Sequence, residues 1–68
     1  MMDQFTYYSL FKASLEKHDK TLAAEFEQQL AERGTARWMF MWLEQLRLNG
    51  KLPAELERPL EDFYSLYY

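Results

Sequence analysis

Only two glycines and two prolines punctuate this 68-residue chain, at Gly34, Gly50, Pro53 and Pro59. These residue types are the strongest local markers of where helices and strands end. The chain contains no valine and no isoleucine, the residues that strands favour most. We therefore predict an all-α fold, a small three- to four-helix bundle forming a single helical domain over residues 1–68. Proline is tolerated in the first turn of a helix, so Pro59 should begin the last helix.

Residues with capping preferences set the expected ends of the other helices. Asp3, Asp19 and Thr35 are good N-caps. Gly34 and Gly50 each follow a segment with a basic residue near its end, as glycines just beyond helices commonly do. The expected helices cover residues 4–17, 20–33, 36–49 and 59–67, with a short turn at residues 53–57. Because a short break separates the first two helices, they should form an antiparallel hairpin.

Each expected helix has a stripe of apolar residues at helical spacing, which predicts the core. In chain order the stripes are Tyr8, Phe11 and Leu15 with Tyr7 at their flank; Leu22, Ala23, Phe26 and Leu30; Met39, Trp42, Leu43 and Leu46 with Trp38 at the edge; and Leu60, Phe63, Leu66 and Tyr67.

The aromatic-rich third helix is unusual because six consecutive residues, Trp38 to Leu43, are large and apolar. At about 100° per residue, six successive side chains point in every direction around a helix. Phe40 and Met41, and Leu48 beyond them, therefore lie off the expected core face. Two outcomes are open for these three side chains: contact with a partner, or burial beneath the C-terminal helix.

The composition favours a partner. Five Phe, five Tyr and two Trp are more aromatic residues than one short chain readily encloses. A core of this size supplies little stability, and small proteins commonly add a disulfide, a metal or oligomerisation. With no cysteine and one histidine, the chain has neither disulfides nor a cluster of metal-ligating side chains. Oligomerisation remains, and we expect a homodimer.

The inventory of reactive groups argues against an enzyme and against any cofactor or metal. Nucleophilic catalysis needs a base beside the nucleophile, and the only imidazole, His18, falls in an expected turn where it should be a solvated loop residue. Two isolated glycines cannot form a phosphate-binding loop. The pairs Glu55 with Glu57 and Glu61 with Asp62 are too few to bind zinc or calcium.

The predicted function is therefore a non-catalytic protein–protein interaction module: a homodimeric helical regulator or accessory protein that binds and modulates a host protein. Very short, cysteine-free, aromatic-rich chains suit the accessory proteins of phages and mobile elements. Buried aromatic side chains would anchor the contact, and charges would orient it. The candidate partner-binding residues are Arg37, Phe40, Met41, Glu44, Arg47, Leu48, Phe63, Tyr64 and Tyr67.

A helical regulator of transcription or replication is the alternative function. The segment from residue 33 to 51 holds four cations against a single acid, Glu44, and aromatic side chains beside cations can stack on nucleic-acid bases. The two helices around Gly34 also have helix-turn-helix spacing. Against this, the net charge is −3, and the third helix would expose apolar Phe40 and Met41. The candidate nucleic-acid residues are Arg33, Arg37, Arg47 and Lys51.

The expected location is cytoplasmic, without membrane association. The first four residues show neither the basic nor the apolar region of a secretory signal. The longest apolar run is six residues, whereas a membrane-spanning helix needs roughly 20. The last segment is acidic, whereas helices that lie on membranes favour cations.

Overall fold

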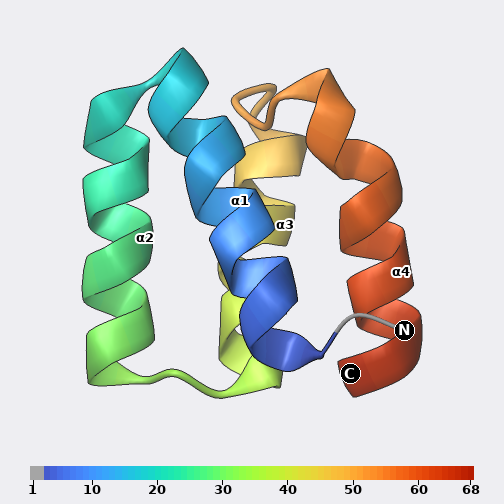
Figure 1. The fold of residues 1–68 in the computed structure, drawn as a ribbon. Helices are drawn as coiled ribbons and strands as arrows, with labels where there is room; N and C mark the ends of the chain where they lie inside the picture. The colour runs from blue at the N-terminus through green and yellow to red at the C-terminus, as the bar shows by residue number, and fades with distance from the viewer. Residues whose placement is uncertain (1–2) are drawn as a thin grey trace.

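Four α-helices make up most of residues 3–68, which the computed structural model describes (Figure 1). They are α1 (Gln4–His18), α2 (Lys20–Glu32), α3 (Ala36–Leu48) and α4 (Glu57–Tyr67), with a one-turn 3₁₀-helix, η1 (Ala54–Leu56), before α4. No strand occurs within residues 3–68. The all-α prediction is confirmed.

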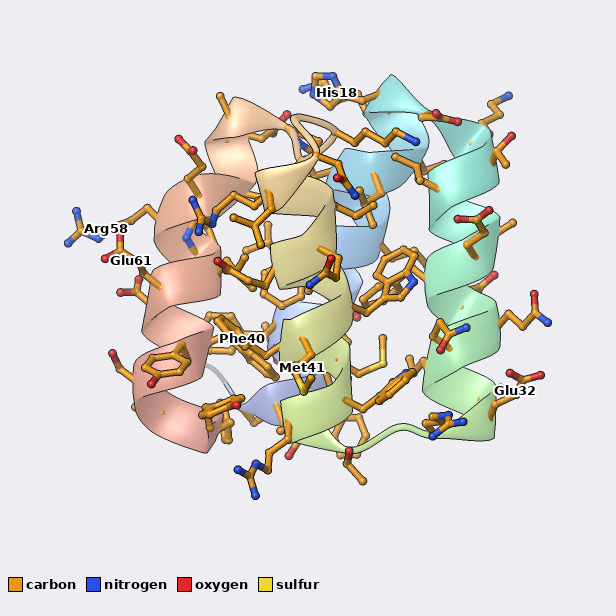
Figure 2. The ribbon with its side chains drawn as sticks, turned by 180° about the vertical axis from the view of Figure 1, so that it is seen from behind. His18, Glu32, Phe40, Met41, Arg58 and Glu61 are labelled. Carbon is orange, nitrogen blue, oxygen red and sulfur yellow. The ribbon has the colours of Figure 1, made fainter. Side chains whose placement is uncertain are left out.

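The helices form a bundle in which α1 and α3 lie on opposite sides of the molecule. Figure 1 shows α1 in front, between α2 and α4, and Figure 2, turned by 180°, shows α3 in the same position on the other side. Helices α1 and α2 form the expected antiparallel hairpin (Figure 1). The outer side of α3 is therefore flanked by α2 and α4 but covered by neither.

Three side-chain caps fix where the first three helices begin. Asp3 Oδ1 accepts from the Thr6 N–H at 2.8 Å, and Asp19 Oδ1 accepts from the Thr21 N–H at 3.0 Å. Thr35 Oγ1 accepts from the Trp38 N–H at 3.2 Å. Each cap satisfies a helix N–H that has no intrahelical partner. The three starts lie where the capping residues predict them.

Helix α3 ends in a Schellman motif built around Gly50. Gly50 has φ +71°, the Lys51 N–H donates to the Leu46 carbonyl at 2.8 Å, and the Gly50 N–H donates to the Arg47 carbonyl at 3.1 Å. This left-handed conformation suits glycine because it has no Cβ. Gly34, after α2, has φ +57°.

The start of α4 differs from the prediction. The helix begins at Glu57, two residues before Pro59, and directly follows η1. The N–H groups of a helix's first turn have no intrahelical acceptor, so proline is tolerated at the third position as well as the first. Pro59 therefore lies inside the first turn and does not mark where the helix begins.

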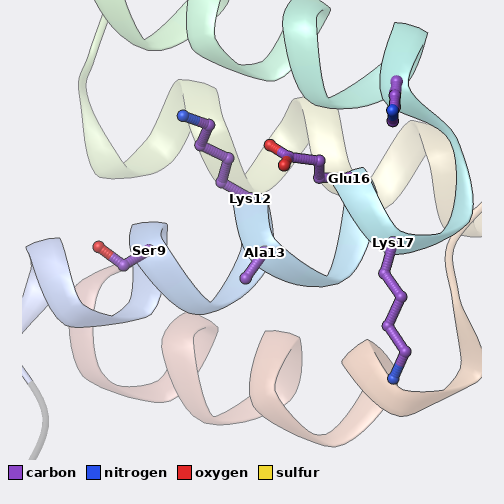
Figure 3. Close-up of a pocket in the computed structure, with 6 residues that line it drawn as sticks. Ser9, Lys12, Ala13, Glu16 and Lys17 are labelled. Atoms are coloured by element: carbon purple, nitrogen blue, oxygen red, sulfur yellow. The ribbon is translucent and has the colours of Figure 1, made fainter.

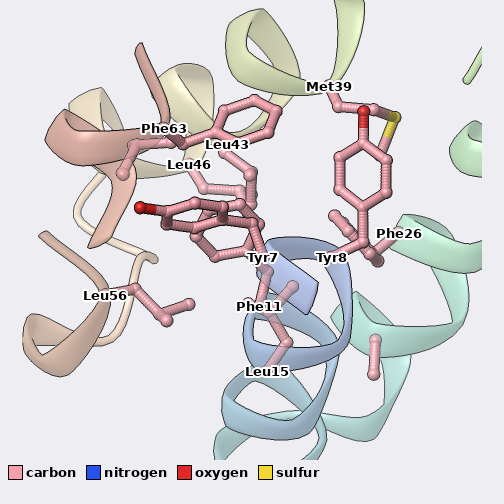
Figure 4. Packing of buried hydrophobic residues seen from close by; sticks show 12 residues of the cluster. Tyr7, Tyr8, Phe11, Leu15, Phe26, Met39, Leu43, Leu46, Leu56 and Phe63 are labelled. Carbon is pink, nitrogen blue, oxygen red and sulfur yellow. The ribbon is translucent and has the colours of Figure 1, made fainter. Parts of the chain in front are cut away.

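Three phenylalanines from three helices form the centre of the core (Figure 4). Phe11 of α1 packs edge-on against Phe26 of α2 and Phe63 of α4, with ring centroids 6.4 Å and 5.5 Å apart. Met39 and Leu43 of α3 complete this layer and are fully buried. Burying each such side chain stabilises the fold by about 1.5–3 kcal/mol.

Five residues of the predicted core stripes lie at its edge instead: Leu22, Leu30, Trp42 and Tyr67 are half-buried, and Leu66 is exposed. Trp42 is half-buried on the α2 side of α3, with its ring centroid 5.9 Å from that of Phe26. Leu66 is exposed because it lies about 60° beyond Phe63 around the axis of α4. Leu56 of η1 is buried in their place, where a turn was expected.

Candidate functional site

Two large apolar side chains remain exposed on the outer side of α3. Met41 and Leu48 are seven residues, about two turns, apart and so project on the same side of the helix. Met41 is 50% exposed and Leu48 is 63% exposed. Figure 2 shows Met41 on the outward side of α3. The fold of the single chain therefore leaves these two side chains available for contact.

Phe40, in contrast, is partly covered by α4. Its ring centroid lies 4.8 Å from that of Tyr64 and 5.1 Å from that of Tyr68. Tyr64 and Tyr68 stack on each other at 4.7 Å. Of the two outcomes open for the off-core residues, coverage by the C-terminal helix therefore applies to Phe40. Both tyrosines keep nearly half of their surface exposed.

Charged side chains border these apolar residues. The Arg37 guanidinium lies 5.2 Å above the ring of Tyr68, within the range of a cation–π contact. Arg47 Nε donates to Glu44 Oε1 at 3.0 Å, and a second N–H of the guanidinium reaches the same oxygen. This bond lowers the pKa of Glu44 and raises that of Arg47. The pair is thus charged across the neutral pH range.

A groove of about 480 Å³ runs between α3 and α4, and we call it the α3–α4 groove. Three of its lining residues carry carboxylates and one carries a guanidinium, so the formal charge of its lining is −2. The remaining lining residues are apolar or aromatic. The full lining is Phe40, Glu44, Arg47, Glu57, Leu60, Glu61 and Tyr64.

Two predicted partner-binding residues do not reach this side of the molecule. Phe63 is 0% exposed and packs against Tyr7 and Phe11, so its assignment to a binding surface is wrong. Tyr67 is half-buried, with its ring centroid 6.0 Å from that of Tyr7 and 5.3 Å from that of Phe63. Residues 63 and 67 share a stripe of α4 that faces α1.

The next stripe of α4, which faces α3, contains four residues that the sequence pattern did not indicate as partner-binding: Glu57, Leu60, Glu61 and Tyr68. Tyr68 joins Tyr64 there because the two are four residues apart. Glu57, Leu60 and Glu61 line the α3–α4 groove from the same helix. In the sequence, only the i, i+4 spacing of Tyr64 and Tyr68 indicated that the two rings would lie on one side of α4. Which stripe faces which neighbour depends on the docking of α4.

The four cations of the nucleic-acid alternative do not form one patch. Arg33 lies over the ring of Trp38 at 4.2 Å, near the turn between α2 and α3. Arg37 lies over Tyr68, whereas Arg47 is bound by Glu44 ten residues, about 15 Å, further along α3. Lys51 follows the end of α3.

The two indole rings are also partly withdrawn from solvent. Trp38 Nε1 donates to Gln29 Oε1 at 2.7 Å, and Trp42 packs against Phe26. Both tryptophans are half-buried. Neither ring therefore offers a free stacking platform beside an unpaired cation.

A second depression, of about 470 Å³, lies on the outer side of α1 (Figure 3). Its charged side chains do not converge on a common point. Lys12 Nζ binds Glu27 Oε1 at 2.7 Å across to α2, and Figure 3 shows Lys17 pointing away from Lys12. The lining residues are Ser9, Lys12, Ala13, Glu16, Lys17 and Lys20. The depression is a solvated face rather than a built anion site.

His18 is the last residue of α1, and it is exposed but not free. Its Nε2 lies 2.6 Å from Glu55 Oε1, so it joins the end of α1 to η1. His18 is solvated as expected, but it belongs to the last turn of α1 rather than to a loop. No group of three or more metal-ligating side chains occurs in the described part of the chain.

Comparisons with protein-family models, with curated proteins and with solved structures return no match for this chain. None of the helices between residues 3 and 68 combines the length and apolarity needed to cross a bilayer. The functional proposal therefore depends on the geometry of the chain itself.

Proposed function

We propose that this protein is a small non-catalytic protein–protein interaction module. Its binding face, the α3–α4 surface, consists of the outer side of α3 and the adjoining side of α4. One observation carries the proposal: Met41 and Leu48 stay exposed on one side of α3, beside a ring cluster that is only partly buried. The α3–α4 surface comprises Arg37, Phe40, Met41, Glu44, Arg47, Leu48, Tyr64 and Tyr68.

Orders of magnitude indicate how the side chains of this surface would share the free energy of binding. Burying the exposed parts of Met41 and Leu48 supplies about 2–3 kcal/mol in total. A dissociation constant of about 1 µM needs about 8 kcal/mol. The rings of Phe40, Tyr64 and Tyr68 must therefore supply much of the remainder. Aromatic anchors beside arginines are the usual composition of interface centres.

We propose self-association as the first form of this binding. In a symmetric dimer the same patch on both copies makes the contact. With two α3 helices antiparallel, Met41 of one copy would face Leu48 of the other, which would cover all four exposed side chains. The same surface would bind and modulate a host protein. The aromatic-rich, cysteine-free composition supports an accessory role of the kind encoded by phages and mobile elements.

Size exclusion with light scattering tests this proposal on the wild type and on a Met41→Ser plus Leu48→Ser variant. We expect a dimer for the wild type and a monomer of equal helicity for the double variant, because both side chains are exposed. Phe5→Ser is the control, since Phe5 is 74% exposed on α1, away from the α3–α4 surface. It should leave the mass unchanged.

Affinity capture from a cell lysate with the same three proteins extends the test to a host partner. The double variant should lose the partner that the wild type and the Phe5→Ser control recover. A monomeric wild type whose captured proteins are unchanged in the double variant would contradict the proposal. The nucleic-acid alternative is tested by gel shift with random duplex and single strands at low salt, where we expect no complex.

A further inference from the structure

The α3–α4 groove combines an apolar floor with an acidic rim. Phe40, Leu60 and Tyr64 supply apolar and aromatic surface, and the carboxylates lie around them. Within the described residues, neither the Glu57 nor the Glu61 carboxylate has a hydrogen bond or a close ion pair. These two groove carboxylates are thus left without a counter-charge in contact.

Arg47 shows which kind of charge this groove favours. Its guanidinium is the only cation among the lining residues, and it binds Glu44 at the α3 wall. Its pKa is raised mainly by that bond to Glu44, and further by the charges of Glu57 and Glu61 across the groove. The chain's own arginine therefore occupies one edge of a site with more negative charge than it can neutralise.

The molecule also shows how its aromatic rings receive guanidinium groups. Arg33 lies over Trp38 and Arg37 lies over Tyr68, at 4.2 Å and 5.2 Å from the ring centroids. Tyr64, which lines the groove, stacks on Tyr68 and is 48% exposed. A guanidinium entering the groove would thus meet both carboxylates and the face or edge of an exposed ring.

From this charge complementarity we propose that the α3–α4 groove receives an arginine or lysine side chain from a basic amphipathic helix of a partner protein. An apolar side chain of the same helix would pack against Phe40 and Tyr64. This inference rests on the proposed function, because it names the chemistry of the partner at the same surface. A negative net charge of −3 on the whole chain would favour the encounter.

A second copy of this chain is the poorer occupant. Its basic face lies on α1, where Lys12 is already bound to Glu27 and the lysines diverge. Contact between the groove of one copy and α1 of the next would also join different patches, which generates rings or open-ended chains instead of a closed dimer. The occupant of the groove is therefore a different protein, and it would compete with the proposed dimer because both contacts use Phe40 and Tyr64.

The test uses two labelled synthetic helical peptides of about 14 residues. Their leucine positions are identical, but the polar positions are arginine in one peptide and glutamate in the other. Fluorescence anisotropy with the full-length protein should show binding of the arginine peptide, weakening as salt rises from about 50 to about 200 mM. The glutamate peptide should not bind. Amide shifts in ¹⁵N-labelled protein should fall on α3 and α4.

Three variants then test which charged side chains of the protein determine binding of the arginine peptide. Glu57→Gln plus Glu61→Gln should weaken binding of the arginine peptide by about tenfold, because both groove carboxylates without a counter-charge are removed. Glu25→Gln plus Glu32→Gln makes the same change in net charge on α2, away from the groove, and should change affinity by less than about twofold. Arg47→Gln should strengthen binding, because it removes the competing cation. Circular dichroism confirms that each variant folds.

Several results would overturn the inference. These are equal binding of the two peptides, equal losses in the α2 control and the groove variant, or amide shifts centred on α1. Dissociation of a wild-type dimer by Glu57→Gln plus Glu61→Gln would identify a second copy as the occupant. If Met41→Ser plus Leu48→Ser abolishes partner capture while the groove variant does not, the α3–α4 surface remains the proposed binding face. The proposal that the partner inserts a basic side chain into the groove is then wrong.

Discussion

The two glycines have the same backbone conformation but different surroundings. A Cβ at Gly34 would lie 2.8 Å from the Leu30 carbonyl oxygen, whereas one at Gly50 would meet nothing within 4 Å. We expect Gly50→Ala to destabilise the fold by about 1 kcal/mol, from the left-handed conformation alone. Gly34→Ala should cost at least about 1 kcal/mol more, because the clashing atom belongs to a helix backbone. Urea unfolding followed by circular dichroism measures both; equal effects would contradict this reading.

The hydrogen bond between His18 and Glu55 should make the stability of the fold depend on pH in the acid range. The hydrogen bond with His18 lowers the pKa of Glu55. A carboxyl whose pKa is lower when folded stabilises the fold above its unfolded pKa of about 4.3, and this contribution is lost as pH falls through the folded pKa. Glu55→Gln should therefore destabilise the protein at pH 7, and its difference from the wild type should shrink as pH falls below about 4. Urea midpoints across this range test it, with exposed Glu25→Gln as the control.

If Glu55→Gln and the wild type lose stability in parallel from neutral to acid pH, the bond between His18 and Glu55 contributes nothing in solution. The contribution of an exposed pair is small in any case because water screens it. The informative quantity is therefore the change in the difference between the two proteins, rather than its size at one pH.

At the scale of elements, local signals were sufficient for the first three helices. Asp3, Asp19 and Thr35 each satisfy N–H groups within the next three residues, so a cap can be identified without knowing the rest of the fold. Pro59 carried no such information, because the whole first turn of a helix tolerates proline. Residues 54–56 form η1 instead of an irregular turn because Leu56 is buried beneath α1 and α4. This is a tertiary effect, which local sequence does not reveal.

Helix α3 offers a matched pair of methionines for testing its orientation. Met39 and Met41 are two residues, about 200°, apart around the axis, and their exposed fractions are 0% and 50%. Met39→Ser should cost about 3 kcal/mol or more, because it leaves a cavity and a buried hydroxyl. Met41→Ser should cost less than about 1 kcal/mol when both proteins are compared well below the dissociation constant of the dimer, where the wild type is monomeric. Thermal melts of the two variants compare them directly, and similar losses would mean that α3 is rotated.

On the scale of the whole molecule, the candidate surface was only partly predictable. Helical geometry alone requires that Met39, Phe40 and Met41 cannot all face one core. It does not determine that α4 docks beside Phe40 and leaves Met41 open, because that depends on where η1 directs the chain. The same docking turns Phe63 inward and brings Glu57 and Glu61 to the groove. The described residues contain no further α-helix that could cover α3.

This uncovered side links self-association to stability. If two copies pair through the α3–α4 surface, mass action stabilises each chain by about 1.6 kcal/mol when the total concentration is 100 times the dissociation constant, because the free chain is then only about 7 times that constant. For a domain of 60–100 residues, 1 kcal/mol shifts Tm by about 4–8 °C. Raising the protein from about 1 to about 100 µM should therefore add about 1.2 kcal/mol per chain and raise Tm by roughly 5–9 °C if the dissociation constant lies near the lower value.

The Met41→Ser plus Leu48→Ser variant should melt at one temperature across the same range, since a monomer has no concentration-dependent term. Phe5→Ser should keep the wild-type dependence, because Phe5 lies on α1 rather than on the α3–α4 surface. Calorimetry at both concentrations measures all three proteins. A wild-type Tm that does not change with concentration, together with a monomeric mass, would mean that the exposed side of α3 serves only a different protein. Dependence that survives in the double variant would place the dimer contact elsewhere.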